Sequence, residues 1–184
     1  MEAIDILMEE HRVVERVLDA LETAARRLSE GEPIRAGFFV DAAGFIKGFA
    51  DGCHHMKEEG VLFEAMVAHG MSREEGPIQV MLVEHERGRE YTRAMREAAE
   101  RLAAGDAAAL DGVVRNAQDY VALLRQHIVK EDRVLFPMAS RVIPPENQAK
   151  VTEDFERIEH EETGEGVHEK YLAAAEALEV EANQ

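Results

Sequence analysis

The chain has 184 residues, of which 46% are hydrophobic and 32% are charged, and its formal net charge is −17. This length and composition are typical of one folded domain with a sizeable core, and they argue against a disordered chain. The excess of acidic groups argues against nucleic acid and anionic membranes as partners, because both carry negative charge.

The expected compartment follows from cysteine use and from the lack of targeting signals. Cys53 is the only cysteine, so no disulfide can form within the chain, which is typical of a reducing environment. Residues 1–8 lack the basic region and long apolar run of a signal peptide. No apolar run reaches the length of a transmembrane helix. We therefore expect a cytoplasmic protein.

Apolar residues recur at helical spacing along almost the whole chain, which predicts an all-α fold. The first helix is expected to end near Pro33. The second is expected to run from about Arg35 to about His69, where a glycine follows as a good C-terminal stop. Gly76 and Pro77 mark the start of a third helix.

The remaining elements complete a bundle. Asp106 is predicted to cap a fourth long helix, which ends before the pair Pro144–Pro145. A shorter fifth helix and a last helical segment follow, separated by a Gly-Glu-Gly break. Short connections between long helices predict antiparallel neighbours. We therefore predict an up-down-up-down four-helix bundle over residues 1–142, with a C-terminal helical extension over residues 143–184 that packs on the same domain.

Four histidines fall one per predicted long helix, each on or beside the apolar face: His11, His54, His85 and His127. A single histidine on such a face is usually a packed core residue. Four of them in successive helices, each near midspan, predict a shared site. The chain also contains a weak internal repeat, because the step from His11 to His85 nearly equals the step from His54 to His127.

Two of these histidines are followed four residues later by a glutamate, Glu58 after His54 and Glu131 after His127. Four residues along a helix bring both side chains to one face. Burying a carboxylate there is costly unless a cation is shared with the histidine. The alternative, a pair of His–Glu hydrogen bonds on the helix surface, predicts polar neighbours. Instead, a Val-Leu-Phe run begins three residues after each glutamate.

The number of candidate ligands predicts two metal ions rather than one. A single octahedral ion would be saturated by four imidazoles and two carboxylates. Two ions could share both carboxylates as bridges and keep positions open for a small ligand. Imidazole and carboxylate without thiolate suit iron or manganese better than a structural zinc. The ferritin-like bundles differ, because they use Glu-x-x-His pairs together with separate glutamates.

Residues 1–140 resemble the hemerythrin-like (HHE cation-binding) family, most clearly over residues 54–63 (HHMKEEGVLF) and 127–137 (HIVKEDRVLFP). The resemblance implies a four-helix bundle around two iron ions with an oxo or hydroxo bridge. Members of the family bind O2 reversibly, sense oxygen or iron, or act on nitric oxide and peroxide. The resemblance implies that the imidazoles are terminal ligands, from His11, His54, His85 and His127. It implies that the carboxylates are bridging ligands, from Glu58 and Glu131.

One position departs from the O2-carrying members of this family. Those proteins have a His-x3-His pair on the third helix, whereas here Arg89 follows His85 at that spacing and cannot bind a metal. The pattern is closer to the four-His, two-Glu branch, which includes iron-sensing F-box domains and iron–sulfur-repair di-iron proteins.

Three further histidines are weighed as additional ligands. His168 follows the Gly-Glu-Gly break, and we predict that it folds over the open end of the bundle and completes or gates the metal site. The alternative is a solvated residue in the first turn of a helix. His160 lies among glutamates, as on a charged surface. His55 points about 100° away from His54 on an ideal helix, which favours a supporting contact or a helix interface over direct metal binding.

Three functions are compatible with this sequence. The first is a non-haem di-iron protein that binds, senses or reacts with O2, nitric oxide or peroxide, with an external reductant for any turnover. The second is an iron- or oxygen-responsive binding module without turnover, whose fold depends on the metal. The third is a plain helical bundle with incidental histidines, fully stable without metal. No general acid or base stands out, so no catalytic residue is assigned.

Overall fold

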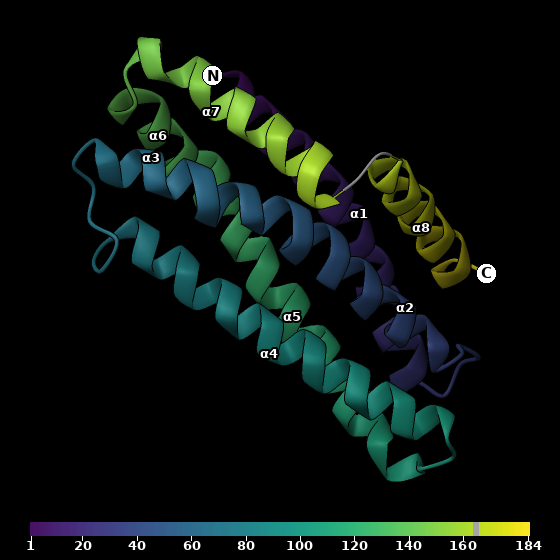
Figure 1. Cartoon of the computed structure of the whole chain (residues 1–184). Coiled ribbons are helices and arrows are strands. Elements are labelled where there is room, and N and C mark those ends of the chain that lie inside the picture. The colour runs from purple at the N-terminus through teal and green to yellow at the C-terminus, as the bar shows by residue number, and fades with distance from the viewer. Residues whose placement is uncertain (164–165) are drawn as a thin grey trace.

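The computed structural model describes residues 1–163 and 166–184, apart from the side chains of residues 161–163 and of His168. The described residues are almost entirely helical and contain no strand. Figure 1 shows the long helical rods of the bundle side by side, with shorter C-terminal helices lying along them. The predicted all-α bundle is confirmed.

The first rod is α1 (Glu2–Ser29), and the third is α4 (Pro77–Ala103). The second rod continues through four consecutive helical segments, α2 (Gly37–Phe45), η1 (Ile46–His55), η2 (Glu58–Leu62) and α3 (Phe63–Ala68). The fourth rod is also composite, with η3 (Ala107–Ala109), α5 (Leu110–Lys130), η4 (Glu131–Leu135) and α6 (Phe136–Val142). The C-terminal extension consists of α7 (Pro145–Arg157), η5 (Ile158–Thr163) and α8 (Val167–Ala182).

Glycine and aspartate define the connections between the rods. Gly70 and Gly76 have φ angles of 99° and 75°, in the left-handed region that residues with a Cβ rarely adopt. Both lie in the loop that ends the second rod and begins the third. The side chain of Asp106 accepts a hydrogen bond from the backbone N–H of Ala108 (3.1 Å) and so caps the short turn η3 that leads into α5.

The rods form a closed ring, in which α1 contacts α2 and α5, and α4 also contacts α2 and α5. In the extension, α7 packs on α1 and η2, while α8 packs on α1 and α2. Tyr171 fixes α8 in place, because its ring lies against Phe45 and Phe49 and its hydroxyl occupies the space beside Gly48. A Cβ at Gly48 would lie 1.7 Å from the Tyr171 oxygen, so only glycine fits there.

Two apolar clusters fill the interior of the bundle. One contains Leu7, Leu62 and Phe136, and the other contains Leu18 and Phe49. In each rod, the predicted metal ligands lie between the residues of these two clusters. The packing therefore encloses a polar layer between two apolar layers, which keeps water away from it.

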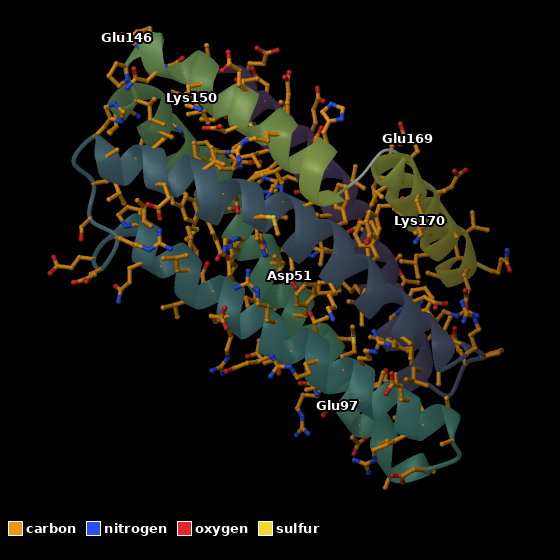
Figure 2. The ribbon with its side chains drawn as sticks, viewed as in Figure 1. Asp51, Glu97, Glu146, Lys150, Glu169 and Lys170 are labelled. Carbon is orange, nitrogen blue, oxygen red and sulfur yellow. The ribbon has the colours of Figure 1, made fainter. Side chains whose placement is uncertain are left out.

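Charged side chains cover the outside of the molecule. Figure 2 shows Glu97, Glu146, Lys150 and Glu169 projecting away from the helical body, whereas Asp51 lies along the second rod, beside the third. Among the described helices, none is both long and apolar enough to cross a bilayer.

Candidate metal centre

Six of the seven predicted ligands come together in the buried polar layer, and all four rods contribute. No more than 2% of any of these six residues is exposed: His11, His54, Glu58, His85, His127 and Glu131. The side chain of the seventh, His168, lies outside the described residues. Each rod thus places one histidine in the same buried layer, as the sequence periodicity predicted.

Both His-x3-Glu pairs include residues of π-helical segments. His54 is near the end of η1, and Glu58 begins η2. In the fourth rod, His127 is near the end of α5, and Glu131 begins η4. A π-turn hydrogen-bonds across one more residue than an α-turn, and such turns are frequent at functional sites. The wider turns rotate side chains away from the directions of an ideal α-helix.

Each buried glutamate directs its two oxygens toward different histidines. Glu58 Oε1 lies 3.5 Å from His54 Nε2, and Glu58 Oε2 lies 3.4 Å from His85 Nε2. Glu131 Oε2 lies 3.2 Å from His11 Nε2, and Glu131 Oε1 lies 3.1 Å from His127 Nε2. Each carboxylate therefore connects a histidine of one pair, His11 and His54, to a histidine of a second pair, His85 and His127.

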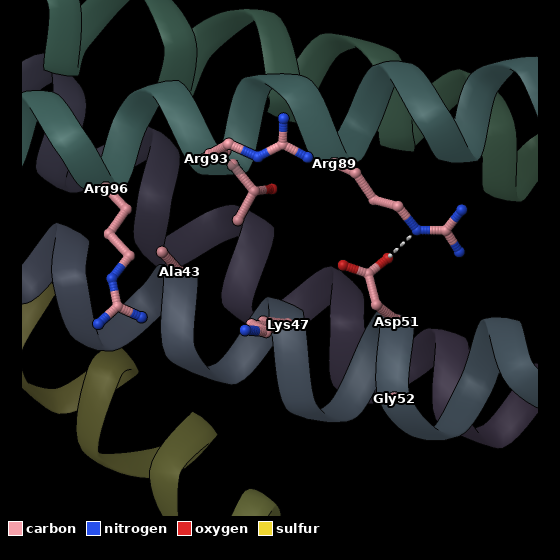
Figure 3. A pocket seen from close by; sticks show the side chains of 8 residues that line it. Ala43, Lys47, Asp51, Gly52, Arg89, Arg93 and Arg96 are labelled. Carbon is pink, nitrogen blue, oxygen red and sulfur yellow. Dashed lines mark ion pairs between the residues drawn. The ribbon is translucent and has the colours of Figure 1, made fainter.

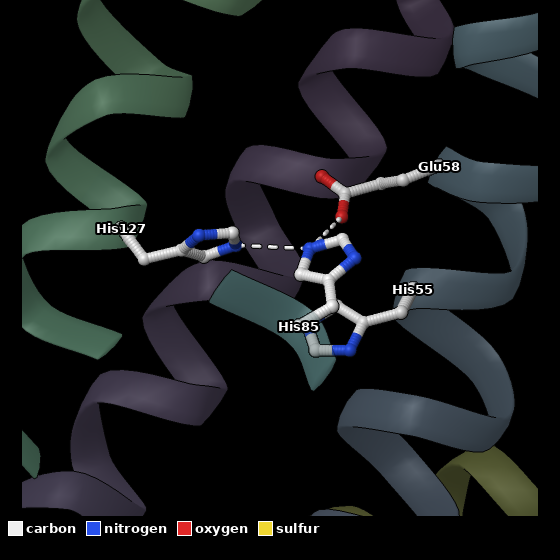
Figure 4. Close-up of side chains that lie close together, drawn as sticks. All are labelled: His55, Glu58, His85 and His127. Atoms are coloured by element: carbon white, nitrogen blue, oxygen red, sulfur yellow. Dashed lines mark hydrogen bonds and ion pairs between the residues drawn. The ribbon is translucent and has the colours of Figure 1, made fainter. Parts of the chain in front are cut away.

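The two histidines of the second pair are spaced as ligands of one cation. The Nε2 atoms of His85 and His127 lie 3.0 Å apart, as Figure 4 shows. Two nitrogen ligands about 2.1 Å from a cation, at about 90° to each other, are separated by about 3 Å. The observed spacing is compatible with two ligands of one cation, and in the absence of a cation the same distance is a hydrogen bond between the rings.

Several polar atoms of this layer are buried and have no hydrogen-bond partner among the described residues. They are Nε2 of His11 and His54 and both carboxylate oxygens of Glu58 and Glu131. An unpaired buried polar atom costs free energy, and a buried carboxylate costs more. Cations would satisfy all of these atoms together, since the unpaired atoms are the ones that face the centre of the layer.

A carboxylate orients each histidine from behind. The Nδ1 atoms lie 2.7–2.9 Å from one carboxylate oxygen each, in the pairs His11–Asp132, His54–Glu10, His55–Asp51, His85–Glu59 and His127–Glu84. With the Nδ1 proton donated to a carboxylate, the Nε2 lone pair is free to bind a metal. This arrangement fixes both the tautomer and the orientation of each ring.

These outer carboxylates repeat the internal symmetry of the chain. Glu10 directly precedes His11 and supports His54, just as Glu84 directly precedes His85 and supports His127. Each of these two glutamates also accepts a hydrogen bond from a lysine three residues after the histidine, Lys57 for Glu10 and Lys130 for Glu84. The sequence repeat therefore corresponds to a repeated set of contacts around one centre.

His55 lies in the layer as well, although the ideal-helix argument directed it elsewhere. Its ring stacks on that of His85 with a centroid distance of 3.8 Å and an interplanar angle of 17°. Its ligand atoms group with those of Glu58, His85 and His127 within 4.8 Å, and a second such group is formed by His11, His54, Glu58 and Glu131. The ring of His55 therefore makes the helix-interface contact that the sequence favoured, and its nitrogen also lies within reach of the group around Glu58. Asp51, four residues before His55, was the sequence signal for this supported histidine.

Burial and mutual charge set the protonation of the metal-free layer. Burial and the charge of Glu131 raise the pKa of Glu58 well above its ordinary value. Burial also favours the neutral form of Glu131. The pKa of Glu131 is nevertheless held well below its ordinary value by the neighbouring imidazoles of His127, His11 and His85. Burial likewise opposes protonation of His127, yet Glu131 and Glu84 raise its pKa to about 9. The layer thus holds protons that a metal would displace.

The remaining candidates have other surroundings. His160 is exposed, as the charged sequence around it predicted. Cys53 is buried near Glu10 and Glu159, which with it form a further group of possible ligands. The ammonium group of Lys57 already lies between these two glutamates, at 2.5 Å from Glu10 and in contact with Glu159. That group is therefore neutralised by a side chain.

Comparison with known proteins agrees with this geometry. The chain is 29% identical over 159 residues to the uncharacterized proteins Rv1995 of Mycobacterium tuberculosis and Mb2018 of Mycobacterium bovis. The aligned segment covers 86% of this chain but only 62% of each of those proteins. No solved structure matches. The family model of the hemerythrin HHE cation-binding domain matches residues 2–139, which include all six converging His and Glu residues, and the chain therefore belongs to the hemerythrin HHE cation-binding family.

Proposed function

We propose that the chain binds two iron ions in the buried polar layer and uses them to bind, sense or react with O2, nitric oxide or peroxide. The observation that carries the proposal is the division of oxygens in Glu58 and Glu131, each of which faces one histidine pair with one oxygen and the other pair with the second. A carboxylate with this orientation is suited to bridge two cations.

The ligands divide unequally between the two ions. The first ion would take His11 and His54 with one oxygen from each carboxylate. The second would take His85 and His127 with the remaining oxygens, and His55 would add a third imidazole. Because the first ion has fewer protein ligands, we expect the open position for a small ligand on its side. His168 remains a proposed additional ligand at that position.

The donor chemistry favours iron. Imidazole and carboxylate ligands without thiolate suit redox-active iron, which would supply redox chemistry and open coordination positions for small ligands. The residues of the chain hold the ions, orient the imidazoles through the outer carboxylates and exclude water through the apolar clusters on both sides. No electron-transfer partner site is assigned, and an external reductant would support any turnover.

A second candidate function is an iron- or oxygen-responsive binding module without turnover. It is favoured by the contact between the C-terminal extension and the surroundings of the metal layer. Buried Lys57 joins Glu10, which supports His54, to Glu159 in η5. A change in the metal layer that moves Glu10 would therefore reach the extension. A partner protein that recognises the extension could then respond to iron.

Elemental analysis and visible spectroscopy of protein purified without added metal test the proposal. We expect about two irons per chain and near-ultraviolet bands that shift on addition of azide or a reductant. Replacement of a ligand in each pair, His54→Ala or His127→Ala, should lower the iron content, whereas exposed His160→Ala serves as the matched control. Stoichiometric zinc, or no metal uptake after reconstitution with iron, would contradict the proposal.

The two candidate functions predict different behaviour of the iron-loaded protein. A reactive or ligand-binding centre should consume peroxide or bind nitric oxide with a change in its spectrum. A responsive module should instead show a large change in thermal stability and in proteolysis of the extension on chelation, without turnover of either compound. His168→Ala should strengthen azide binding if His168 occupies the position that would otherwise be open to a small ligand.

A further inference from the structure

A pocket of 580 Å³ lies between the second and third rods, separate from the buried layer. Figure 3 shows side chains from α2 and η1 on one wall and from α4 on the other. Four of the lining residues are basic and one is acidic: Lys47, Arg89, Arg93 and Arg96, with Asp51. A basic pocket is unexpected in a chain with a net charge of −17, because random placement would surround it with acids.

Two of the basic groups lack a counter-charge. Neither Lys47 nor Arg93 forms an ion pair with any other residue that the structure describes, and both are exposed. Arg96 pairs with Glu100 on its own helix at 2.9 Å. An uncompensated pair of cations in a concave site attracts anions, and an arginine can hold a phosphate or carboxylate with two hydrogen bonds.

The innermost cation of the pocket connects it to the metal layer. Arg89 lies 3.4 Å from Asp51 and 2.7 Å from Glu59. Those carboxylates support the rings of His55 and His85, respectively. Arg89 is therefore a positioning residue for two imidazoles on the same side of the metal layer. An anion that draws the Arg89 guanidinium toward the pocket would weaken its hold on both carboxylates.

We propose that this pocket binds a small anion with at least two negative charges, and that its occupancy is communicated through Arg89 to the side of the metal layer formed by His55 and His85. The volume lies within the range of small-molecule pockets, roughly 300–1,000 Å³. A long polyanion such as nucleic acid is repelled by the acidic remainder of the surface. The ligand is therefore a compact phosphate-bearing or dicarboxylate molecule.

Calorimetric titration of the purified protein with inorganic phosphate and with succinate tests the site and separates the two sources of negative charge. Each titration is run at constant ionic strength, with chloride as the monovalent control. We expect saturable binding of at least one dianion and none of chloride. Neutralisation by Lys47→Gln with Arg93→Gln should weaken that binding at least about tenfold, since each lost cation removes a charged hydrogen bond.

The control removes the same charge elsewhere. Arg115→Gln with Arg141→Gln alters two exposed arginines outside the pocket and should leave the dissociation constant unchanged. The charge-retaining pair Lys47→Arg with Arg93→Lys should restore binding. If neither dianion binds saturably, the site does not exist. If the pocket variant and the control variant bind with equal affinity, the anion binds somewhere else, for example at the metal itself.

The connection through Arg89 has its own measurement. In iron-loaded protein, a bound dianion should shift the visible spectrum, and Arg89→Lys should remove that shift while changing the affinity only a few-fold. A spectral shift that persists in Arg89→Lys would overturn the connection. This part rests on the proposed function, whereas the calorimetric result does not. If the protein contains no iron but binds the dianion at Lys47 and Arg93, the proposed di-iron function is refuted and the anion site is retained.

Discussion

His55 and Ile128 occupy equivalent positions in the two halves of the bundle, one directly after His54 and the other directly after His127, and both are buried. The half that contains Ile128 is apolar at this point. The half that contains His55 adds an imidazole whose Nδ1 is supported by Asp51. An otherwise repeated centre is therefore asymmetric, and this asymmetry can be removed by one substitution.

We predict that His55→Ile retains two irons but binds one of them at least about tenfold more weakly, because the second ion loses one ligand. The measurement is competitive titration of iron against a chelator, combined with azide binding to detect a newly open position. Asp51→Asn is the comparison variant, since it leaves the ring in place and should have the smaller effect. Identical iron affinity and an identical spectrum in His55→Ile would show that His55 does not bind the metal.

Replacement of Glu58 separates metal binding from stability. Glu58→Gln should lose both irons, because the proposed bridge is removed. In metal-free protein, the pKa of Glu58 is raised by burial, so its presence costs stability progressively as the pH rises above the ordinary value of 4.5. Metal-free Glu58→Gln should therefore be more stable than the metal-free parent at neutral pH, by about 1–3 kcal/mol.

This stability difference should shrink as the pH falls through 4.5, below which the parent glutamate is protonated in both the folded and the unfolded chain. Urea denaturation of both metal-free proteins across this pH range measures it. Exposed Glu64→Gln is the control and should show no such trend. A Glu58→Gln variant that is less stable than the parent at neutral pH would contradict the assigned protonation.

Metal uptake should release protons near neutral pH. In the metal-free layer the pKa of His127 is about 9, since Glu131 and Glu84 outweigh the effect of burial, and the pKa of Glu58 is raised by burial. Both groups carry protons that a bound cation displaces, so iron affinity should increase as the pH rises toward about 9. Calorimetric titration in buffers of different ionisation enthalpy counts the released protons. Proton-neutral binding would contradict this mechanism.

The lysines of the two halves should differ in their contribution to stability. Lys57 is fully buried and pairs with Glu10 and Glu159, whereas Lys130 is 39% exposed on its side chain and pairs with Glu84. Lys57→Met leaves a buried carboxylate without its cation and should cost about 3–5 kcal/mol. Lys130→Met should cost no more than about 1 kcal/mol, since the Lys130 ammonium is partly solvated and Glu84 keeps its contact with His127.

Thermal or urea denaturation of the iron-loaded proteins compares the two lysine variants directly. Lys57→Met should also increase the proteolysis of residues that follow Arg157, because the contact between η5 and the second rod is lost. Equal losses of stability in Lys57→Met and Lys130→Met would show that burial of Lys57 adds nothing to the ion pair.

The helical bundle and six residues of the polar layer could be predicted from the amino-acid sequence alone. Helical periodicity is a local property, and it places His11 and His85 on the apolar faces of their helices without knowledge of the neighbours. The i, i+4 spacing of His54 and Glu58 has the same local origin. A buried carboxylate beside a buried imidazole then implies a cation, because few other partners offset the cost of burial.

The orientation of these residues and the contacts that support them depend on how the rods pack against one another. The stacking of His55 on His85 joins the second rod to the third, which sequence periodicity does not reveal. The pairing of Glu10 with His54, and of Asp132 with His11, joins residues on different rods. The basic pocket likewise requires that η1 and α4 lie side by side. These features arise from contacts between segments far apart in the chain, and local sequence patterns do not predict such contacts.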